Sequence, residues 1–131
     1  MTATDLVNNF SRLESRISEK KGEFTLFALF LREDVADRWD LMVSAPWVGT
    51  DRKGALQYFV DEIRSFLGPE DLTVLARIVI VDPNDAAVQN LNRAISVEHG
   101  RTEVRDSNFF GLPIKHAYII TSKLPSAPVA G

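Results

Sequence analysis

Few residues in this chain have the chemistry of a catalytic or metal site. The two histidines, His99 and His116, fall on different predicted elements, and neither has a second ligand at i+3 or i+4. Cysteine is absent, which excludes disulfides, thiolate nucleophiles and cysteine-ligated metals. The chain also lacks the GxSxG elbow and the glycine-rich phosphate loops GxGxxG and GxxxxGK[ST]. We therefore predict no catalytic residue, no metal and no cofactor.

A few polar residues remain as members of a possible polar site: Asp40, Arg77, Asp82, His116 and Tyr118. Arg77 is the most unusual of them, because it interrupts the apolar stretch LTVLARIVIVD. A guanidinium is costly to bury without a counter-ion, so we expect Arg77 to meet a carboxylate. Asp40 is the first choice, with Glu33 or Asp34 as alternatives. A structural pair is favoured over a ligand contact.

The stretch around Asp40, ALFLREDVADRWDLMVSA, has the pattern of a hairpin that follows one helix and precedes another helix and a strand. This layout resembles the minimal nucleotidyltransferase fold, whose first strand ends in Gly-Ser and whose second carries Asp-x-Asp. The resemblance implies a Mg²⁺-nucleotide site with at least two carboxylates. Asp40 matches one aspartate, whereas Leu31-Arg32 and Met42 occupy the other motif positions. Asp82 would complete the set, or serve only as a helix N-cap.

Two loops carry large apolar side chains beside turn-forming residues. Trp47 and Val48 lie in APWVGT, and Phe109 and Phe110 lie in SNFFGLPI. Loops run over the protein surface, and exposed aromatic residues tend to mark contact sites. Filling of the core by these side chains is the favoured interpretation. If the two loops lie close together, they form a patch for a protein partner or for a second copy of the chain.

Hydrophobic periodicity predicts the elements that position these residues. The expected order is α-β-β-α-β-α-β-β, with helices near 5–21, 51–67 and 83–98 and strands at 24–32, 39–45, 72–81, 102–106 and 115–123. Thr4 is expected to cap the first helix and Asp82 the third. Strands 24–32 and 72–81 are apolar on both faces, so we place them at the centre of a mixed sheet in an α+β fold, an α/β sandwich. The expected strand order is 2-1-3, with the last hairpin beyond strand three.

Length and composition limit the classes of function. The chain has 131 residues, 45% hydrophobic and 25% charged, which predicts a single domain over 1–123 and a disordered tail over 124–131. A net charge of -3 without a large basic cluster argues against nucleic-acid binding. We expect no leader, no membrane span and a cytoplasmic protein.

We interpret the chain as a non-catalytic protein-interaction module, whose partner is another protein or a second copy of the chain in a homodimer, rather than as an enzyme. The alternatives are a nucleotidyltransferase-like domain, active or degenerate, and a small-ligand-binding domain that uses Tyr118, His116 and Arg77.

Overall fold

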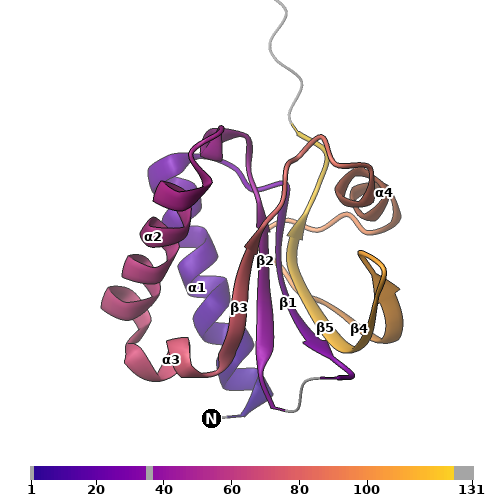
Figure 1. Ribbon diagram of the computed structural model, residues 1–131, viewed down its shortest axis with the longest axis horizontal. Coiled ribbons are helices and arrows are strands. Elements are labelled where there is room, and N and C mark those ends of the chain that lie inside the picture. Colours follow the sequence, from indigo (N-terminus) through magenta and orange to yellow (C-terminus); the bar gives the residue numbers. More distant parts are fainter. Residues whose placement is uncertain (1, 35–36, 126–131) are drawn as a thin grey trace, which may run out of the picture.

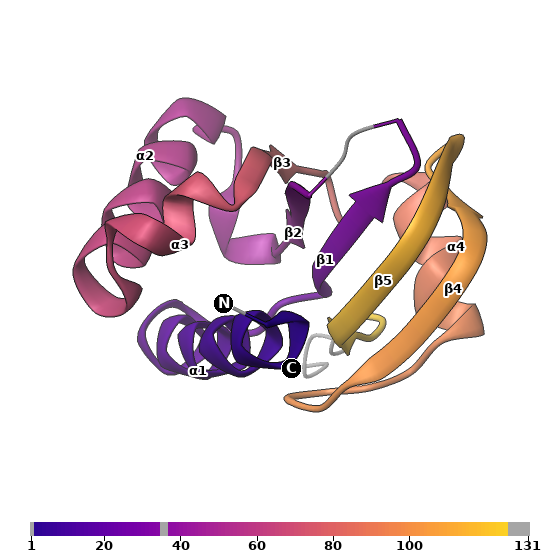
Figure 2. The same cartoon turned by 90° about the horizontal axis from the view of Figure 1, so that it is seen from below.

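A mixed β-sheet separates two layers of helices (Figures 1 and 2). The computed structural model describes residues 2–34 and 37–125, and in these residues the sheet has five strands in the order β3-β2-β1-β5-β4. The strands are β1 (Leu26–Arg32), β2 (Trp39–Ser44), β3 (Leu75–Ile80), β4 (Thr102–Phe109) and β5 (Leu112–Ser122). The helices are α1 (Ala3–Lys21), α2 (Arg52–Glu62), α3 (Pro69–Thr73) and α4 (Ala86–Ala94), with a 3-10 turn at Pro46–Val48 and a π-helical turn at Ile63–Leu67. The α+β class is confirmed, and α3 is an addition to the predicted order.

Each face of the sheet has its own hydrophobic cluster, because side chains alternate along a strand. On one face, Leu29 and Leu41 pack with residues of α1 and α2, among them Phe10. On the other face, Ala28 and Met42 pack with residues of α4 and of the β4–β5 hairpin. The helices α1 and α2 therefore cover one face and α4 covers the other (Figure 2).

The strand predicted at 72–81 lies at an edge of the sheet, so the prediction that it is central is wrong. Among the described strands, β3 pairs with β2 alone, in parallel, whereas β1 is central as predicted and pairs with β2 and β5. This order replaces the predicted 2-1-3. An apolar pattern on both faces indicates cover above and below a strand, which β3 has in part, since Ala76 and Arg77 are exposed. Such a pattern does not report whether both edges of the strand are paired. Pro69 also begins α3, so that β3 starts at Leu75.

Helix α1 begins earlier than predicted because its cap is Thr2 and not Thr4. The Thr2 hydroxyl accepts a hydrogen bond from the Asp5 N–H (3.1 Å), and the Asp5 carboxylate accepts one from the Thr2 N–H (3.3 Å). This reciprocal capping box satisfies donors that the first helical turn leaves free. The predicted apolar stripe, which includes Phe10 and Leu13, is buried.

Helix α4 is shorter than predicted, and Asp82 does not cap it. Asp82 closes a turn in which its Oδ1 accepts from the Asn84 N–H (2.8 Å). The cap is Asp85, whose Oδ1 accepts from the Ala87 N–H (2.8 Å). The helix ends at Ala94, and residue Val97 instead bridges to β5.

The described residues contain no helix that is both long and apolar enough to cross a membrane. After β5, the exposed residues Leu124 and Pro125 have no regular structure. The rest of the tail predicted to be disordered, residues 126–131, lies outside the described residues. The domain boundary at residue 123 stays a prediction.

Candidate functional site

The outer edge of β3 presents backbone hydrogen-bonding groups that β2 does not use. The Val81 N–H donates to the Val43 carbonyl (2.8 Å). Backbone groups alternate between the two edges of a strand, so the N–H and C=O groups of Val79 and Val81 point toward β2. The N–H and C=O groups of Ile78 and Ile80 therefore point away from the sheet. The Ile80 carbonyl accepts a hydrogen bond from the Arg52 guanidinium.

An apolar hollow of about 360 Å³ lies beside this edge, between α2, α3 and β3. It is lined by Leu56, Val60, Leu72, Leu75, Arg77 and Ile78. Leu56 is 40% exposed, which is unusual for a large aliphatic residue in this molecule. The β3 edge and the hollow together form a continuous surface of hydrophobic side chains and outward backbone groups, which we call the β3 edge surface.

The predicted partner of Arg77 is confirmed, and a second arginine joins the pair. Asp40 is only 2% exposed, and its Oδ2 accepts from the Nε of Arg77 (3.0 Å) and from the Nε of Arg32 (2.8 Å). Arg32 also contacts Asp34 (3.4 Å), so this aspartate binds a different arginine from the one predicted. Asp40 Oδ1 is buried and has no hydrogen-bond donor among the described residues. The cluster neutralises a buried carboxylate and fixes the starts of β2 and β3.

Asp40 and Asp82 do not converge as a two-metal site requires. Asp40 is near the beginning of β2, whereas Asp82 follows the end of β3, and these strands are parallel, so the two carboxylates lie at opposite ends of the sheet. Among residues 2–34 and 37–125, no group of three or more His, Cys, Asp or Glu side chains is arranged to hold a metal. The geometry therefore gives no support to an active nucleotidyltransferase centre.

His116 and Tyr118 are neighbours, but Arg77 is not near them. Their rings are 4.5 Å apart on the face of the sheet that α1 covers, whereas Arg77 meets Asp40 on the opposite face. His116 Nε2 lies 2.7 Å from Glu103 Oε1. Hydrogen bonds from Arg105 and, second, from His116 lower the pKa of the exposed Glu103 carboxyl. The predicted ligand site made of these three residues is therefore not assembled.

The aromatic loops lie in different clusters. Trp47 Nε1–H donates to the Gly22 carbonyl (3.1 Å), and its ring packs edge-on against Phe24 (5.6 Å between centroids). Trp47 and Val48 thus pack in the cluster under α1 and α2. Phe109 and Phe110 pack in the cluster on the α4 face, where Phe109 stacks on Phe30 at 5.0 Å. The two loops are on opposite faces of the sheet and form no common patch, which favours core filling. Partner contact by either loop alone stays a prediction.

A buried carboxylate on α1 escaped the sequence analysis. Glu14 is completely buried, its Oε1 lies 2.6 Å from His99 Nδ1, and its Oε2 accepts from the Thr121 hydroxyl (2.9 Å). Glu14 is four residues after Phe10 and three before Ile17, so its position on the apolar stripe was a signal of burial. The three groups connect α1 to β5 and to the loop that precedes β4.

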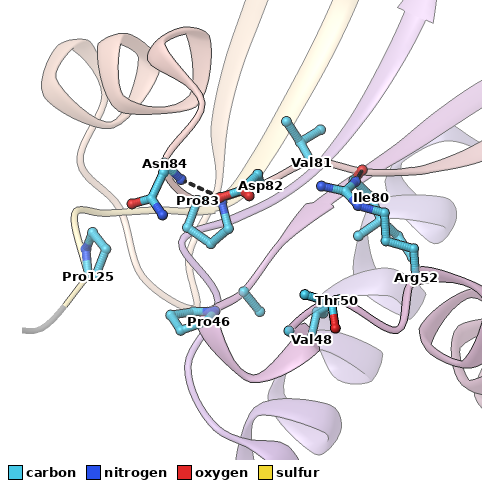
Figure 3. A pocket seen from close by; sticks show the side chains of 12 residues that line it. Pro46, Val48, Thr50, Arg52, Ile80, Val81, Asp82, Pro83, Asn84 and Pro125 are labelled. Carbon is cyan, nitrogen blue, oxygen red and sulfur yellow. Dashed lines mark hydrogen bonds between the residues drawn. The ribbon is translucent and has the colours of Figure 1, made fainter.

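A crevice of about 380 Å³ lies beyond the carboxyl ends of β2 and β3. Figure 3 shows Asp82 and Asn84 on one side of it and Thr50 and Arg52, at the start of α2, on another. Pro46, Val48 and Pro83 add rigid apolar walls. Asp82 is thus the one residue of the predicted polar site that lines this crevice.

Comparisons with protein-family models, with curated proteins and with solved structures give no match to this chain.

Proposed function

We propose that this protein is a non-catalytic interaction module that forms a homodimer by antiparallel pairing of β3 with β3 of a second copy. The observation that supports the proposal is the position of β3, an apolar strand at an edge of the described sheet. Pairing would extend the sheet through the two-fold axis and would use the outward groups of Ile78 and Ile80. We also propose a cytoplasmic location and no role for nucleic acid or membrane.

The β3 edge lacks most of the features that protect exposed edges. Natural edge strands are often blunted by lysine, proline or a bulge. The strand LARIVI contains neither lysine nor proline, and its bulge lies at its beginning, opposite Trp39 and Asp40. Its single charge, Arg77, donates to Asp40. The middle of the edge, residues 78–80, can therefore pair, although its Ile80 carbonyl already accepts a hydrogen bond from Arg52.

The sequence of this edge is self-complementary. The centre of β3 has the palindromic order Ile78, Val79, Ile80. A two-fold axis at Val79 places Ile78 opposite Ile80 of the second copy, so that outward N–H and C=O groups are exchanged as in an antiparallel ladder. Cross-strand pairs of β-branched residues stabilise a sheet. In this register Arg77 lies opposite Val81 and far from its symmetry mate, which avoids repulsion between like charges.

The hollow beside β3 supports the same interface. A strand pair alone is a small contact, whereas stable interfaces bury about 1,200–2,000 Å² in total. Leu56 and Val60 of α2 extend the apolar surface beyond the strand. The opposing copies of these residues would lie across the two-fold axis and enlarge the buried area.

The experiment is a mass measurement by light scattering over a range of concentrations, with Val79→Lys and a control, Ala94→Lys on α4. At the two-fold axis, the introduced lysine of one chain would lie opposite the introduced lysine of the other, and the two positive charges would repel. The Val79→Lys variant should therefore be monomeric under conditions in which the wild type is dimeric. Ala94 is exposed and distant from β3, so its variant should remain dimeric. Circular dichroism verifies that each variant is folded, and Ile78→Pro, which removes an outward N–H and no bond to β2, replaces Val79→Lys if that variant is not. A wild type that is monomeric at all concentrations, or a folded edge variant that stays dimeric, refutes the proposal.

A further inference from the structure

The crevice of Figure 3 lies at a point where the chain changes sides of the sheet. After β2 the chain leads to α2 on one face, and after β3, which is parallel to β2, it leads to α4 on the opposite face (Figures 1 and 2). In open sheets, ligands bind beyond the carboxyl ends of parallel strands where successive connections diverge in this way. The volume of about 380 Å³ is within the range of small-molecule sites.

The cationic side of the crevice is Arg52. Its bond to the Ile80 carbonyl uses one N–H group of a guanidinium that has five. That bond also fixes the guanidinium beside the crevice instead of leaving it free in solvent. The planar donor fork of arginine matches the oxygens of a carboxylate or a phosphate.

The opposite side of the crevice accepts hydrogen bonds. Asp82 is oriented by the bond from the Asn84 N–H to its Oδ1 (2.8 Å), and a carboxylate oxygen can accept more than one bond. The Asn84 side chain adds an amide with both donor and acceptor groups. Hydroxyl groups of a ligand satisfy these partners, whereas a bare anion would meet the like charge of Asp82.

We propose that this crevice binds a small organic anion that carries hydroxyl groups. Its phosphate or carboxylate head contacts Arg52, and its hydroxyl groups contact Asp82 and Asn84. Pro46, Val48 and Pro83 form the apolar walls that limit its size. Binding at this site does not require the protein to be dimeric, although Arg52 also contacts the Ile80 carbonyl at the proposed dimer edge.

Isothermal titration calorimetry with four probes tests the proposal. Ribose 5-phosphate and gluconate carry the two alternative heads, inorganic phosphate lacks hydroxyl-bearing carbons, and ribose lacks the charge. We expect at least one of the first two to bind, at least ten-fold more tightly than inorganic phosphate and ribose. Comparison of those two probes identifies the head group.

Variants assign the binding to the crevice. Arg52→Ala is expected to weaken binding at least ten-fold, whereas Arg64→Ala, at an exposed position in the π-helical turn, should leave it unchanged. Asp82→Ala should reduce the preference for the hydroxyl-bearing anion over inorganic phosphate. If Arg52→Ala does not fold, Arg52→Gln, which keeps an amide donor for the Ile80 carbonyl, takes its place. Absence of binding by both hydroxyl-bearing anions, or equal binding by the folded Arg52 variant, overturns the proposal. Light scattering on the same samples reports the dimer separately, so failure of one proposal is distinguishable from failure of the other.

Discussion

Removing the two arginines that contact Asp40 is expected to destabilise the fold non-additively. Arg77 is 44% exposed and Arg32 is 17% exposed, and both donate to the same oxygen of Asp40, which is 2% exposed. Because Arg32 still pairs with Asp40 in Arg77→Met, we expect a loss of about 1 kcal/mol, and about 2 kcal/mol for the more buried Arg32. The double variant leaves a buried carboxylate without any cation, which costs about 4–5 kcal/mol and exceeds the sum of the single losses.

Urea denaturation measures these free energies of unfolding. Protein concentration must be fixed and low, because self-association adds a concentration-dependent contribution to stability. Methionine keeps much of the aliphatic packing of an arginine stem, so the losses report mainly the charge. Adding Asp40→Asn to the double variant removes the unpaired charge and should recover at least half of the lost stability. Additive single and double losses, or no recovery by Asp40→Asn, would refute the assignment of Asp40 as a buried charge that two guanidinium groups stabilise.

Other variants test the buried network, one pKa and one aromatic loop. Glu14→Ala should lower the free energy of unfolding, measured by urea denaturation, by about 3 kcal/mol, because it leaves the Thr121 hydroxyl buried without its acceptor. Glu14→Gln keeps an acceptor and should cost less, so equal losses for the two variants would contradict the hydrogen bond. The folded-state pKa of Glu103 is lowered, so its stabilising contribution is present above the unfolded-state pKa and is lost as pH falls through the folded-state pKa. Arg105→Ala should raise the Glu103 titration midpoint measured by NMR, and an unchanged midpoint would exclude Arg105 as the cause. Trp47→Ser should lower the free energy of unfolding by about 2–4 kcal/mol, because the ring packs in the core, and should leave the dimer intact in light scattering. A monomeric Trp47→Ser variant with little change in stability would instead make this loop the interface.

Local patterns in the sequence predict much of this fold, because they record which surfaces a segment buries. The stripe on α1, the burial of both faces of β1 and the pairing of Arg77 with Asp40 all follow from the need to bury apolar side chains and to neutralise a buried charge. The first two depend on a residue's type and its immediate neighbours, and the third depends on the cost of leaving a buried charge unpaired. The position of β3 depends on neither, because edge pairing involves backbone groups that every sequence has.

The parts of the candidate sites that could not be predicted depend on long-range geometry. Arg32 looks like an ordinary strand-end residue, and only the hairpin register brings it to Asp40. Glu14 reaches Thr121 across 107 positions of sequence. The start of α4 was misplaced for a more local reason. Asp82 and Asp85 are both good N-caps, and the turn closed by the Asp82 carbonyl and the Asp85 N–H (3.0 Å) favours the second.

Arg52 connects the two proposals through a single hydrogen bond. Its guanidinium donates to the Ile80 carbonyl, which is one of the outward groups that β3 pairing would use, and it also lines the crevice. That bond holds Arg52 beside the crevice, so pairing that takes this carbonyl would release Arg52 and weaken anion binding. Linkage then requires that the ligand weakens the dimer by the same factor by which dimerisation weakens ligand binding. In Arg52→Gln the amide donor remains but the charge does not, so the dimer should persist and its dependence on the anion should disappear.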